Sequence, residues 1–285
     1  MIPEPIGTRK SLWGEGPLWH EGRLIYVDIE GHAVVIFDPS TGEEKVVEAG
    51  ERVGCVVPRA SGGLVIGGDN GYSFIDPDTA TKTPIADPEP EMADNRFNDG
   101  KCDPSGRFWA GSMSCIKDLG TANLYRLDAD HSLHTMKKSV TTSNGIGWTA
   151  DGKTMFYIDT PTKKMVAFDF DDATGSIANE REVIDFPSLG INDSPDGLAV
   201  DAEGKVWVAI CHGAMVGRFD PETGKEIARI EFPCIETTAC AFGGENLDQL
   251  YVTTGIKNGL DEPEAGRVFV ADPGVRGVPS NAFAG

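Results

Sequence analysis

The chain has 285 residues, of which 40% are hydrophobic and 25% charged, so it is long and apolar enough to bury a sizeable core. Acidic residues outnumber basic ones by 45 to 25, giving a formal net charge of −20. Such a surface repels phosphate, so nucleic acid is not expected as a partner. No stretch approaches the ~20 apolar residues that span a bilayer, and residues 1–10 lack a signal-peptide pattern, so no membrane partner is expected either.

The six cysteines show neither a Cys-x-x-Cys pair nor zinc-finger spacing. They are Cys55, Cys102, Cys115, Cys211, Cys234 and Cys240. Most of them lie in apolar, strand-like segments. This pattern predicts buried free thiols and a reducing, cytoplasmic location.

A short motif, a turn containing glycine followed by an alternating strand, recurs six times along the chain. The copies lie at 22–28, 63–68, 106–111, 152–158, 204–209 and, less regularly, 248–253. They are spaced by roughly 40 to 50 residues, the period of four-stranded propeller blades. A second signal, an apolar run ending in an Asp turn such as Asp-Pro-x-Thr-Gly, follows five of the copies and indicates a further hairpin in each repeat.

These repeats predict an all-β fold, a six-bladed β-propeller with four-stranded antiparallel blades, forming one domain over residues 1–285. The last repeat has no convincing fourth strand after 266–271, whereas residues 7–13 precede the first inner strand without a blade of their own. We therefore expect the N-terminal segment to supply the outer strand of the last blade and close the ring. An open sandwich is the alternative, which the sixfold period disfavours.

Aligning the six copies on their turn glycines defines one equivalent position, about eight residues upstream, at the start of each inner strand. In chain order this position holds Glu15, Cys55, Asn98, Asn144, Asp196 and either Thr237 or Thr238. Equivalent positions of a propeller lie on a ring around its axis. Two carboxylates and two amides on this ring form a hard-oxygen set suited to Ca²⁺, Mg²⁺ or Mn²⁺ and acceptable to Zn²⁺ or Fe²⁺. Alternatively, these residues only cap turns, as in Asn-Gly steps generally.

Candidate substrate contacts surround this ring. Arg96 and Asp99 flank the ring residue at 98, and their side chains can bind hydroxyls or a carboxylate, unless they merely form an ion pair with each other. The loops expected at the mouth are 28–32, 111–120, 159–163, 211–215 and 254–265. Within them Met113, Cys115 and His212 are candidates for substrate contact, the alternative being ordinary loop residues.

Several motifs in this order resemble the SMP-30/gluconolactonase/luciferin-regenerating-enzyme-like family, which includes regucalcin-like sugar lactonases. They are Gly-Glu-Gly-Pro-Leu-Trp at 14–19, Asn-Arg-Phe-Asn-Asp-Gly at 95–100, Ser-Asn-Gly at 143–145, Pro-Asp-Gly at 195–197, Trp-Val-Ala at 207–209, Cys-Ala-Phe-Gly-Gly at 240–244 and Pro-Glu-Ala-Gly at 263–266. The resemblance covers nearly the whole chain.

The resemblance implies a six-bladed propeller with one divalent metal ion and a bound sugar lactone. Its metal ligands match Glu15, Asn144 and Asp196, and its substrate contacts fall on Arg96, Asn98 and Asp99. One departure concerns the loop at 112–118, which is shorter than in regucalcin-like members and lacks their substrate-contacting Glu. The preferred sugar is therefore left open.

The resemblance further implies a lactonase, a metal-dependent hydrolase that opens aldonolactones to sugar acids. In this interpretation the metal polarises the lactone carbonyl, and Asp196 is both ligand and general base. Glu15 anchors the metal, and Asn144 completes its ligand shell. A phosphotriesterase-like metal hydrolase and a calcium-binding regulatory propeller without catalysis are the alternatives. A monomer or small homo-oligomer is expected.

Overall fold

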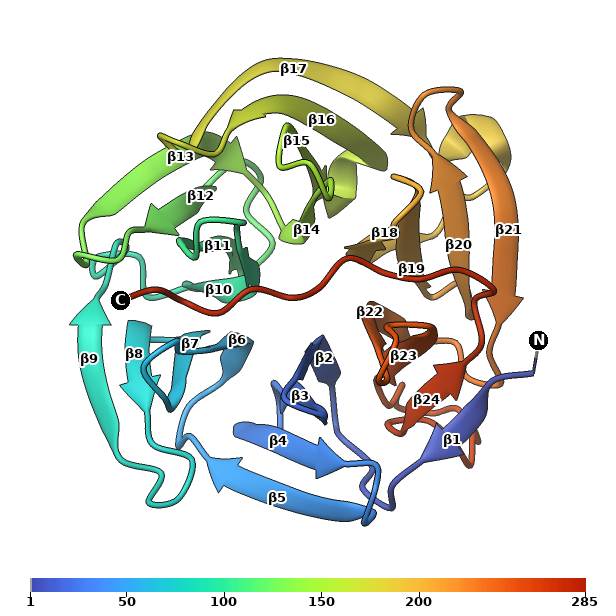
Figure 1. The fold of residues 1–285 in the computed structure, drawn as a ribbon, viewed down its shortest axis with the longest axis horizontal. Helices are drawn as coiled ribbons and strands as arrows, with labels where there is room; N and C mark the ends of the chain where they lie inside the picture. The colour runs from blue at the N-terminus through green and yellow to red at the C-terminus, as the bar shows by residue number, and fades with distance from the viewer. Residues whose placement is uncertain (1) are drawn as a thin grey trace.

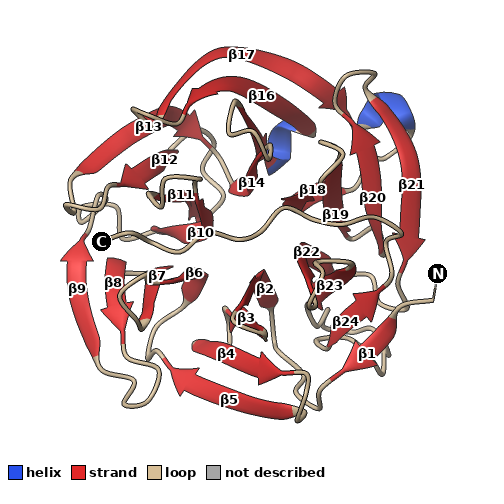
Figure 2. Cartoon of the chain, viewed as in Figure 1, coloured by secondary structure: helices blue, strands red, loops and turns tan. Residues whose placement is uncertain are grey.

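The computed structural model describes residues 2–285 and contains six four-stranded antiparallel sheets arranged as blades around a central axis (Figures 1 and 2). Helical structure in these residues is confined to two short 3-10 turns, η1 (Thr160–Thr162) and η2 (Pro187–Leu189). No helix in this part of the chain has the length and hydropathy needed to cross a membrane. The predicted all-β, six-bladed propeller is confirmed.

Each blade runs outwards from the axis in chain order, from an inner strand to a second strand. The inner strands are β2 (Gly14–His20), β6 (Val53–Pro58), β10 (Asn95–Cys102), β14 (Ser143–Trp148), β18 (Ser194–Val200) and β22 (Thr237–Gly243). The second strands are β3 (Arg23–Asp28), β7 (Leu64–Gly68), β11 (Phe108–Ser114), β15 (Thr154–Asp159), β19 (Val206–Cys211) and β23 (Gln249–Thr254).

The third and fourth strands complete each blade towards the rim. The third strands are β4 (Ala33–Asp38), β8 (Gly71–Ile75), β12 (Ala122–Leu127), β16 (Lys164–Asp171), β20 (Met215–Asp220) and β24 (Val268–Ala271). The outer strands are β5 (Glu43–Glu48), β9 (Lys82–Ala86), β13 (Leu133–Val140), β17 (Ser176–Asp185), β21 (Lys225–Glu231) and β1 (Glu4–Ile6).

The turns of the repeat have the conformations that their residues predict. Gly106 and Gly204, between inner and second strands, have φ of +79° and +73°, a region that other residues rarely adopt. At the turn into β5, the carboxylate of Asp38 accepts a hydrogen bond from the Ser40 amide at 2.9 Å, and its carbonyl accepts one from Gly42 at 2.8 Å. The Asp-Pro-x-Thr-Gly signal therefore closes a hairpin.

The ring closes between the two ends of the chain, as predicted. Strand β1 pairs antiparallel with β24, with Glu4 opposite Val270 and Ile6 opposite Val268. The closing strand lies earlier than residues 7–13, which instead connect it to β2. This blade therefore combines three strands from one end of the chain with one from the other, and no outer strand is left unpaired.

Buried aromatic side chains pack the blades together. Trp109 and Trp207 are fully buried, and each donates its indole N–H to a buried aspartate, Asp103 at 2.9 Å and Asp201 at 3.1 Å. These bonds satisfy polar atoms that would otherwise be costly to bury. All six cysteines are free thiols, five of them buried and Cys115 exposed.

The C-terminal segment was not anticipated from the sequence. After β24 the chain crosses the face of the propeller, as Figure 1 shows in red. The amide of Val278 donates to Val200 at 3.1 Å, and that of Phe283 donates to Pro58 at 2.8 Å. Phe283 is fully buried. The segment therefore ties together blades that are distant from each other around the ring.

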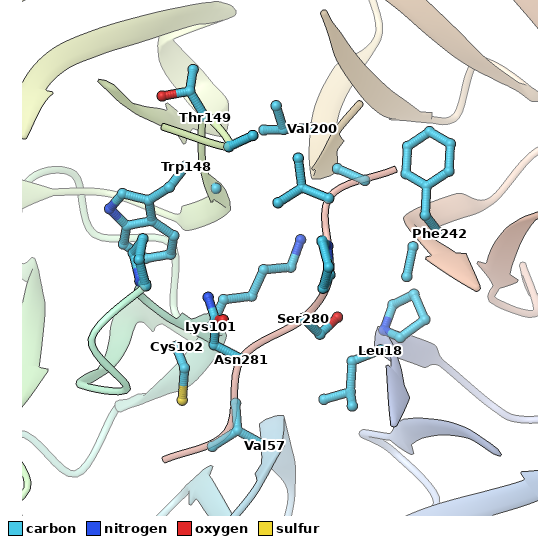
Figure 3. Close-up of a pocket in the computed structure, with 18 residues that line it drawn as sticks. Leu18, Val57, Lys101, Cys102, Trp148, Thr149, Val200, Phe242, Ser280 and Asn281 are labelled. Carbon is cyan, nitrogen blue, oxygen red and sulfur yellow. The ribbon is translucent and has the colours of Figure 1, made fainter. Parts of the chain in front are cut away.

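Beneath this segment lies a cavity of ≈240 Å³, lined by residues from the later part of the inner strands and by 278–281 (Figure 3). Most of its lining is apolar, including Leu18, Trp148 and Phe242. Lys101 reaches into it and hydrogen-bonds to the Leu198 carbonyl. Because the ring positions lie at the beginning of the inner strands, this cavity occupies the opposite end of the axis from them.

Candidate metal and substrate site on the propeller axis

A β-bulge interrupts every inner strand at its ring position. The register shifts lie at Glu15/Leu18, Val53/Cys55, Phe97/Asp99, Asn144/Ile146, Pro195/Leu198 and Thr237/Ala239. A bulge adds a residue to one strand and redirects its side chains. The same irregularity therefore recurs at one level of all six blades, around the entrance to the axis.

The glycines after Asn144 and Asp196 belong to these bulges rather than to turns. A Cβ on Gly145 would lie 2.7 Å from the Asp196 carbonyl oxygen, and one on Gly197 would lie 2.3 Å from the Cβ of Ala239. Neighbouring inner strands thus approach too closely for any larger residue. The interpretation of these Asn-Gly and Asp-Gly steps as simple turn caps is wrong for β14 and β18.

Three carboxylates share the entrance to the axis. Glu15 and Asp196 are 4% and 7% exposed, and Asp99 is 4% exposed. Burial raises the pKa of Glu15 well above its usual value, and the charges of Asp196 and Asp99 raise it further. Burial and the charge of Asp99 do the same to the pKa of Asp196. This grouping of like charges is unfavourable unless protons or a cation neutralise it.

The donor set fits a divalent cation. Oδ1 of Asp196 is buried without any hydrogen-bond partner in the described structure, so a buried acceptor is available to a ligand. Oε2 of Glu15 accepts one hydrogen bond, from the Gly16 amide at 2.8 Å, which leaves most of its lone pairs free. Buried carboxylate oxygens with unused lone pairs are ligands for hard cations.

A chain of hydrogen bonds links the polar residues of three consecutive blades. Arg96 donates to Oδ1 of Asn98 at 2.9 Å, and Nδ2 of Asn98 donates to Oδ1 of Asn144 at 3.1 Å. Nδ2 of Asn144 donates to the Thr160 hydroxyl at 2.8 Å, which donates to the carbonyl of Pro195 at 2.8 Å. The chain therefore ends on the residue before Asp196. Thr160 was not singled out from the sequence, because it follows a second strand rather than beginning an inner one.

The two ring amides consequently have different roles. Nδ2 of Asn98 also donates to the Ser143 carbonyl at 2.8 Å, so its oxygen is turned towards Arg96. Asn144 receives only one hydrogen bond on Oδ1, so this atom retains a lone pair. Asn98 is thus suited to positioning its neighbours, whereas Asn144 can also serve as a ligand.

The remaining ring positions contribute no free oxygen. Cys55 is fully buried in the core. The hydroxyl of Thr237 lies 2.8 Å from the carbonyl oxygen of Ile210, and that of Thr238 lies 2.5 Å from that of Gly14. The polar ring therefore covers four blades of the six.

Arg96 is half-buried and forms no ion pair within residues 2–285, so the predicted alternative of an Arg96–Asp99 pair is not found. Its partial burial lowers its pKa. Asp99 instead accepts the Gly100 amide at 2.7 Å and lies among the axial carboxylates. Met113 pairs with Arg96 across β10 and β11, so these two side chains lie on the same face.

The other two mouth candidates lie at the ends of second strands. Cys115 is exposed and contacts the guanidinium of Arg52 at 3.4 Å. His212 follows β19, and its Nδ1 lies 2.5 Å from Oε2 of Glu236. Glu236, which is 1% exposed and raises the pKa of Asp196, was missed from the sequence. In the sequence, its position directly before the ring residue Thr237 could have indicated that it lies near the axis.

Fold and site together define a class of protein, a six-bladed β-propeller with buried carboxylates and amides at one end of its axis. A model of the SMP-30/gluconolactonase/LRE-like region matches residues 13–256. Regucalcin of Xenopus laevis is 39% identical over 95% of each chain, and the putative sugar lactone lactonase of Bacillus subtilis is 36% identical over 97% of this chain and 96% of its own. The chain belongs to the SMP-30/gluconolactonase family.

Solved structures agree with this assignment. A luciferin-regenerating enzyme superposes with a TM-score of 0.91 at 29% identity, covering 99% of both chains. A regucalcin from Agrobacterium tumefaciens, described as a calcium-binding protein, superposes with a TM-score of 0.90 at 27% identity, covering 96% of this chain and 95% of its own.

Proposed function

We propose that this protein hydrolyses small sugar lactones to the corresponding sugar acids, with one divalent cation held by Glu15, Asn144 and Asp196. The observation that carries the proposal is the buried, unpartnered Oδ1 of Asp196 among three mutually repelling carboxylates. Membership of the SMP-30/gluconolactonase family and a relative named as a putative sugar lactone lactonase support it.

The cation, when bound, would supply an electrophile that polarises the lactone carbonyl. Asp196 is the general base: its carboxylate takes a proton from the attacking water as the oxygen bonds to the carbonyl carbon. The bond from that carbon to the ring oxygen then breaks, and the proton passes to the ring oxygen. The product is an open-chain hydroxy acid.

Arg96, Asn98 and Asp99 are proposed to orient the substrate. The guanidinium of Arg96 has donors left after its bonds to Asn98 and to the Phe97 carbonyl at 2.8 Å. Asp99 is an acceptor for a sugar hydroxyl. Arg96 connects through the hydrogen-bond chain to Asn144, so substrate and cation are held by one network.

A solved relative described as calcium-binding makes Ca²⁺ the first ion to test. The decisive assay strips the protein of metal and restores Ca²⁺, Zn²⁺, Mg²⁺, Mn²⁺ or Fe²⁺ singly. Proton release is then followed on gluconolactone, xylonolactone and a phosphotriester. We expect lactone turnover that is absent after stripping and restored by at least one ion. Turnover of the phosphotriester alone would favour a phosphotriesterase, and no turnover with any ion would favour a binding protein.

A further inference from the structure

A second group of ligating side chains lies beside the axial site and plays no part in the proposed reaction. It consists of Cys211, His212 and Glu236, and one ligand atom from each lies within 4.8 Å of the others. We infer that this group is a separate binding site for a thiophilic divalent cation of the Zn²⁺ class, distinct from the oxygen site at Glu15, Asn144 and Asp196.

The backbone holds the three residues in place. Cys211 ends β19 and forms an isolated antiparallel bridge with Glu236, so their side chains face the same way. The Ala214 amide donates to the Ile235 carbonyl at 3.2 Å and that of Gly255 donates to Glu236 at 2.9 Å, which ties the loop to both neighbouring strands. The group is therefore built on strand ends rather than on a free loop.

The distances match the dimensions of a metal site. Sγ of Cys211 lies 3.2 Å from Oε2 of Glu236 and 3.9 Å from Nδ1 of His212, and the latter two atoms are 2.5 Å apart. A tetrahedral Zn²⁺ with Zn–N and Zn–O bonds of about 2.0–2.2 Å and a Zn–S bond of about 2.3 Å keeps its ligand atoms roughly 3.4–3.6 Å apart, so the two edges to sulfur are close to these dimensions and the Nδ1–Oε2 edge must widen by roughly 0.9 Å. One small ion can therefore contact all three atoms once the side chains of His212 and Glu236 separate by that amount.

The buried carboxylate of Glu236 supplies a negatively charged ligand at this point. Glu236 has a side chain only 2% exposed, and its Oε2 accepts a hydrogen bond from the Cys211 thiol at 3.2 Å and lies 2.5 Å from Nδ1 of His212, so a bound cation would take the place of the protons between these atoms. Its other oxygen, Oε1, lies 3.2 Å from Nζ of Lys257, which also lies 3.4 Å from Nδ1 of His212 and must move away from that nitrogen when an ion binds. The carboxylate can thus bind an ion through one oxygen while Lys257 orients the other, as outer partners of metal ligands do.

The two sites differ in the cation that they select. The axial set is made of carboxylate and amide oxygens, which suit hard ions. A thiol and an imidazole prefer Zn²⁺, Co²⁺ or Cd²⁺. The side chain of His212 is 43% exposed, so the group is accessible from the mouth. Three protein ligands leave a fourth position for water or another small molecule.

Co²⁺ titration of the metal-stripped full-length protein tests the inference, since a thiolate ligand gives cobalt a charge-transfer band that oxygen ligands do not give. We expect the wild-type protein to develop this band at one equivalent per chain. Cys211→Ser should abolish it. His212→Asn should weaken Co²⁺ binding at least tenfold, and asparagine tolerates the left-handed backbone of this residue, φ +70°. Cys115→Ser, at the other side of the mouth, is the matched control and should keep the band.

The readout is independent of lactonase activity. Glu15→Gln removes an axial ligand and should leave the band intact, so failure of the axial site and failure of this site give different results. Absence of the band from the wild-type protein, or its persistence in Cys211→Ser, would overturn the inference.

Discussion

Two properties distinguish the buried Asp196. It has a carboxylate oxygen without a protein partner, and its pKa is raised by burial and by the charge of Asp99. A purely structural aspartate would have both oxygens satisfied, as in Asp103, whose Oδ1 accepts the Arg107 amide and whose Oδ2 accepts the Arg107 guanidinium and the Trp109 indole. Because of this difference, we assign Asp196 to the proposed reaction and Asp103 to the stability of the fold.

Asp196→Asn should lower kcat for lactone hydrolysis by about 10²- to 10⁴-fold, because the amide cannot accept the proton of the attacking water. Arg96→Gln should mainly raise KM, because it removes a substrate contact. Steady-state kinetics at saturating metal separates the two effects. Near-normal kcat in Asp196→Asn with metal bound would show that the base is another group.

Thr160 tests the hydrogen-bond chain. Thr160→Val keeps the shape of the side chain but removes the hydroxyl that joins Asn144 to Pro195. We expect the metal Kd to rise by about 10-fold, the lower end of the usual effect of removing a partner of a metal ligand. Thr162→Val is the control, since its hydroxyl bonds only within the same loop, to Asp159 and Lys164. Calorimetric titration giving equal affinities for both variants would contradict the role of the chain.

The sequence carried information about individual site residues because the propeller repeats them. Aligning the turn glycines was enough to select Glu15, Asn144 and Asp196 as equivalent positions. Thr160 and Glu236 were missed, because their proximity to the site depends on contacts between adjacent blades. The proximity of Asp99 to the other two carboxylates likewise depends on a bulge, which has no reliable sequence signature.

The inner strands and the C-terminal segment have different roles at the two ends of the propeller axis. The bulged beginnings of the inner strands gather the polar residues, whereas residues 278–283 cover the other end of the axis. Phe283 anchors this cover, with its amide and carbonyl bonded to Pro58 and Ala60 and its ring fully buried. The cover therefore stabilises the ring on the side away from the chemistry.

Phe283→Ala should lower the free energy of unfolding by about 3–5 kcal/mol, the usual cost of removing a buried phenyl ring. Lactone KM should be unchanged, because the substituted residue lies at the far end of the axis. Leu260→Ala, at a side chain that is 48% exposed, is the control and should change stability by less than about 0.5 kcal/mol. Denaturant titration that finds both variants equally stable would show that the segment is not an anchor.

Much of the element arrangement could be predicted from the sequence, because each strand is bounded by turn residues. The period placed all six blades and indicated that the N-terminus closes the ring. The closing strand proved to be Glu4–Ile6, earlier than expected, since the pairing partner β24 determines its register. The course of residues 272–285 had no periodic signal, because this segment is held by scattered contacts rather than by a sheet.

For the whole molecule, the buried carboxylates on the axis add to the repulsion between negative charges in a chain whose net charge is −20. Their raised pKa values mean that the folded state binds these protons more tightly than the unfolded state. The contribution of these two carboxylates to the stability of the metal-free protein should therefore be fully present below their unfolded pKa values, around 4, and should be lost as pH rises through the folded ones.

A divalent cation should replace these protons. We expect it to raise Tm more at about pH 8 than at about pH 5, because the unneutralised carboxylates cost most at the higher pH. In the Glu15→Gln, Asp196→Asn double variant this difference should disappear. Differential scanning calorimetry with and without metal at both pH values measures it, and an equal rise in Tm at both would contradict the account.

The most direct test is an anomalous difference map from crystals of the full chain soaked in Mn²⁺, an ion that prefers oxygen ligands. We expect a peak within about 2.5 Å of carboxylate oxygens of Glu15 and Asp196 and of Oδ1 of Asn144. An axis without such a peak, at a Mn²⁺ concentration that supports turnover, would contradict it.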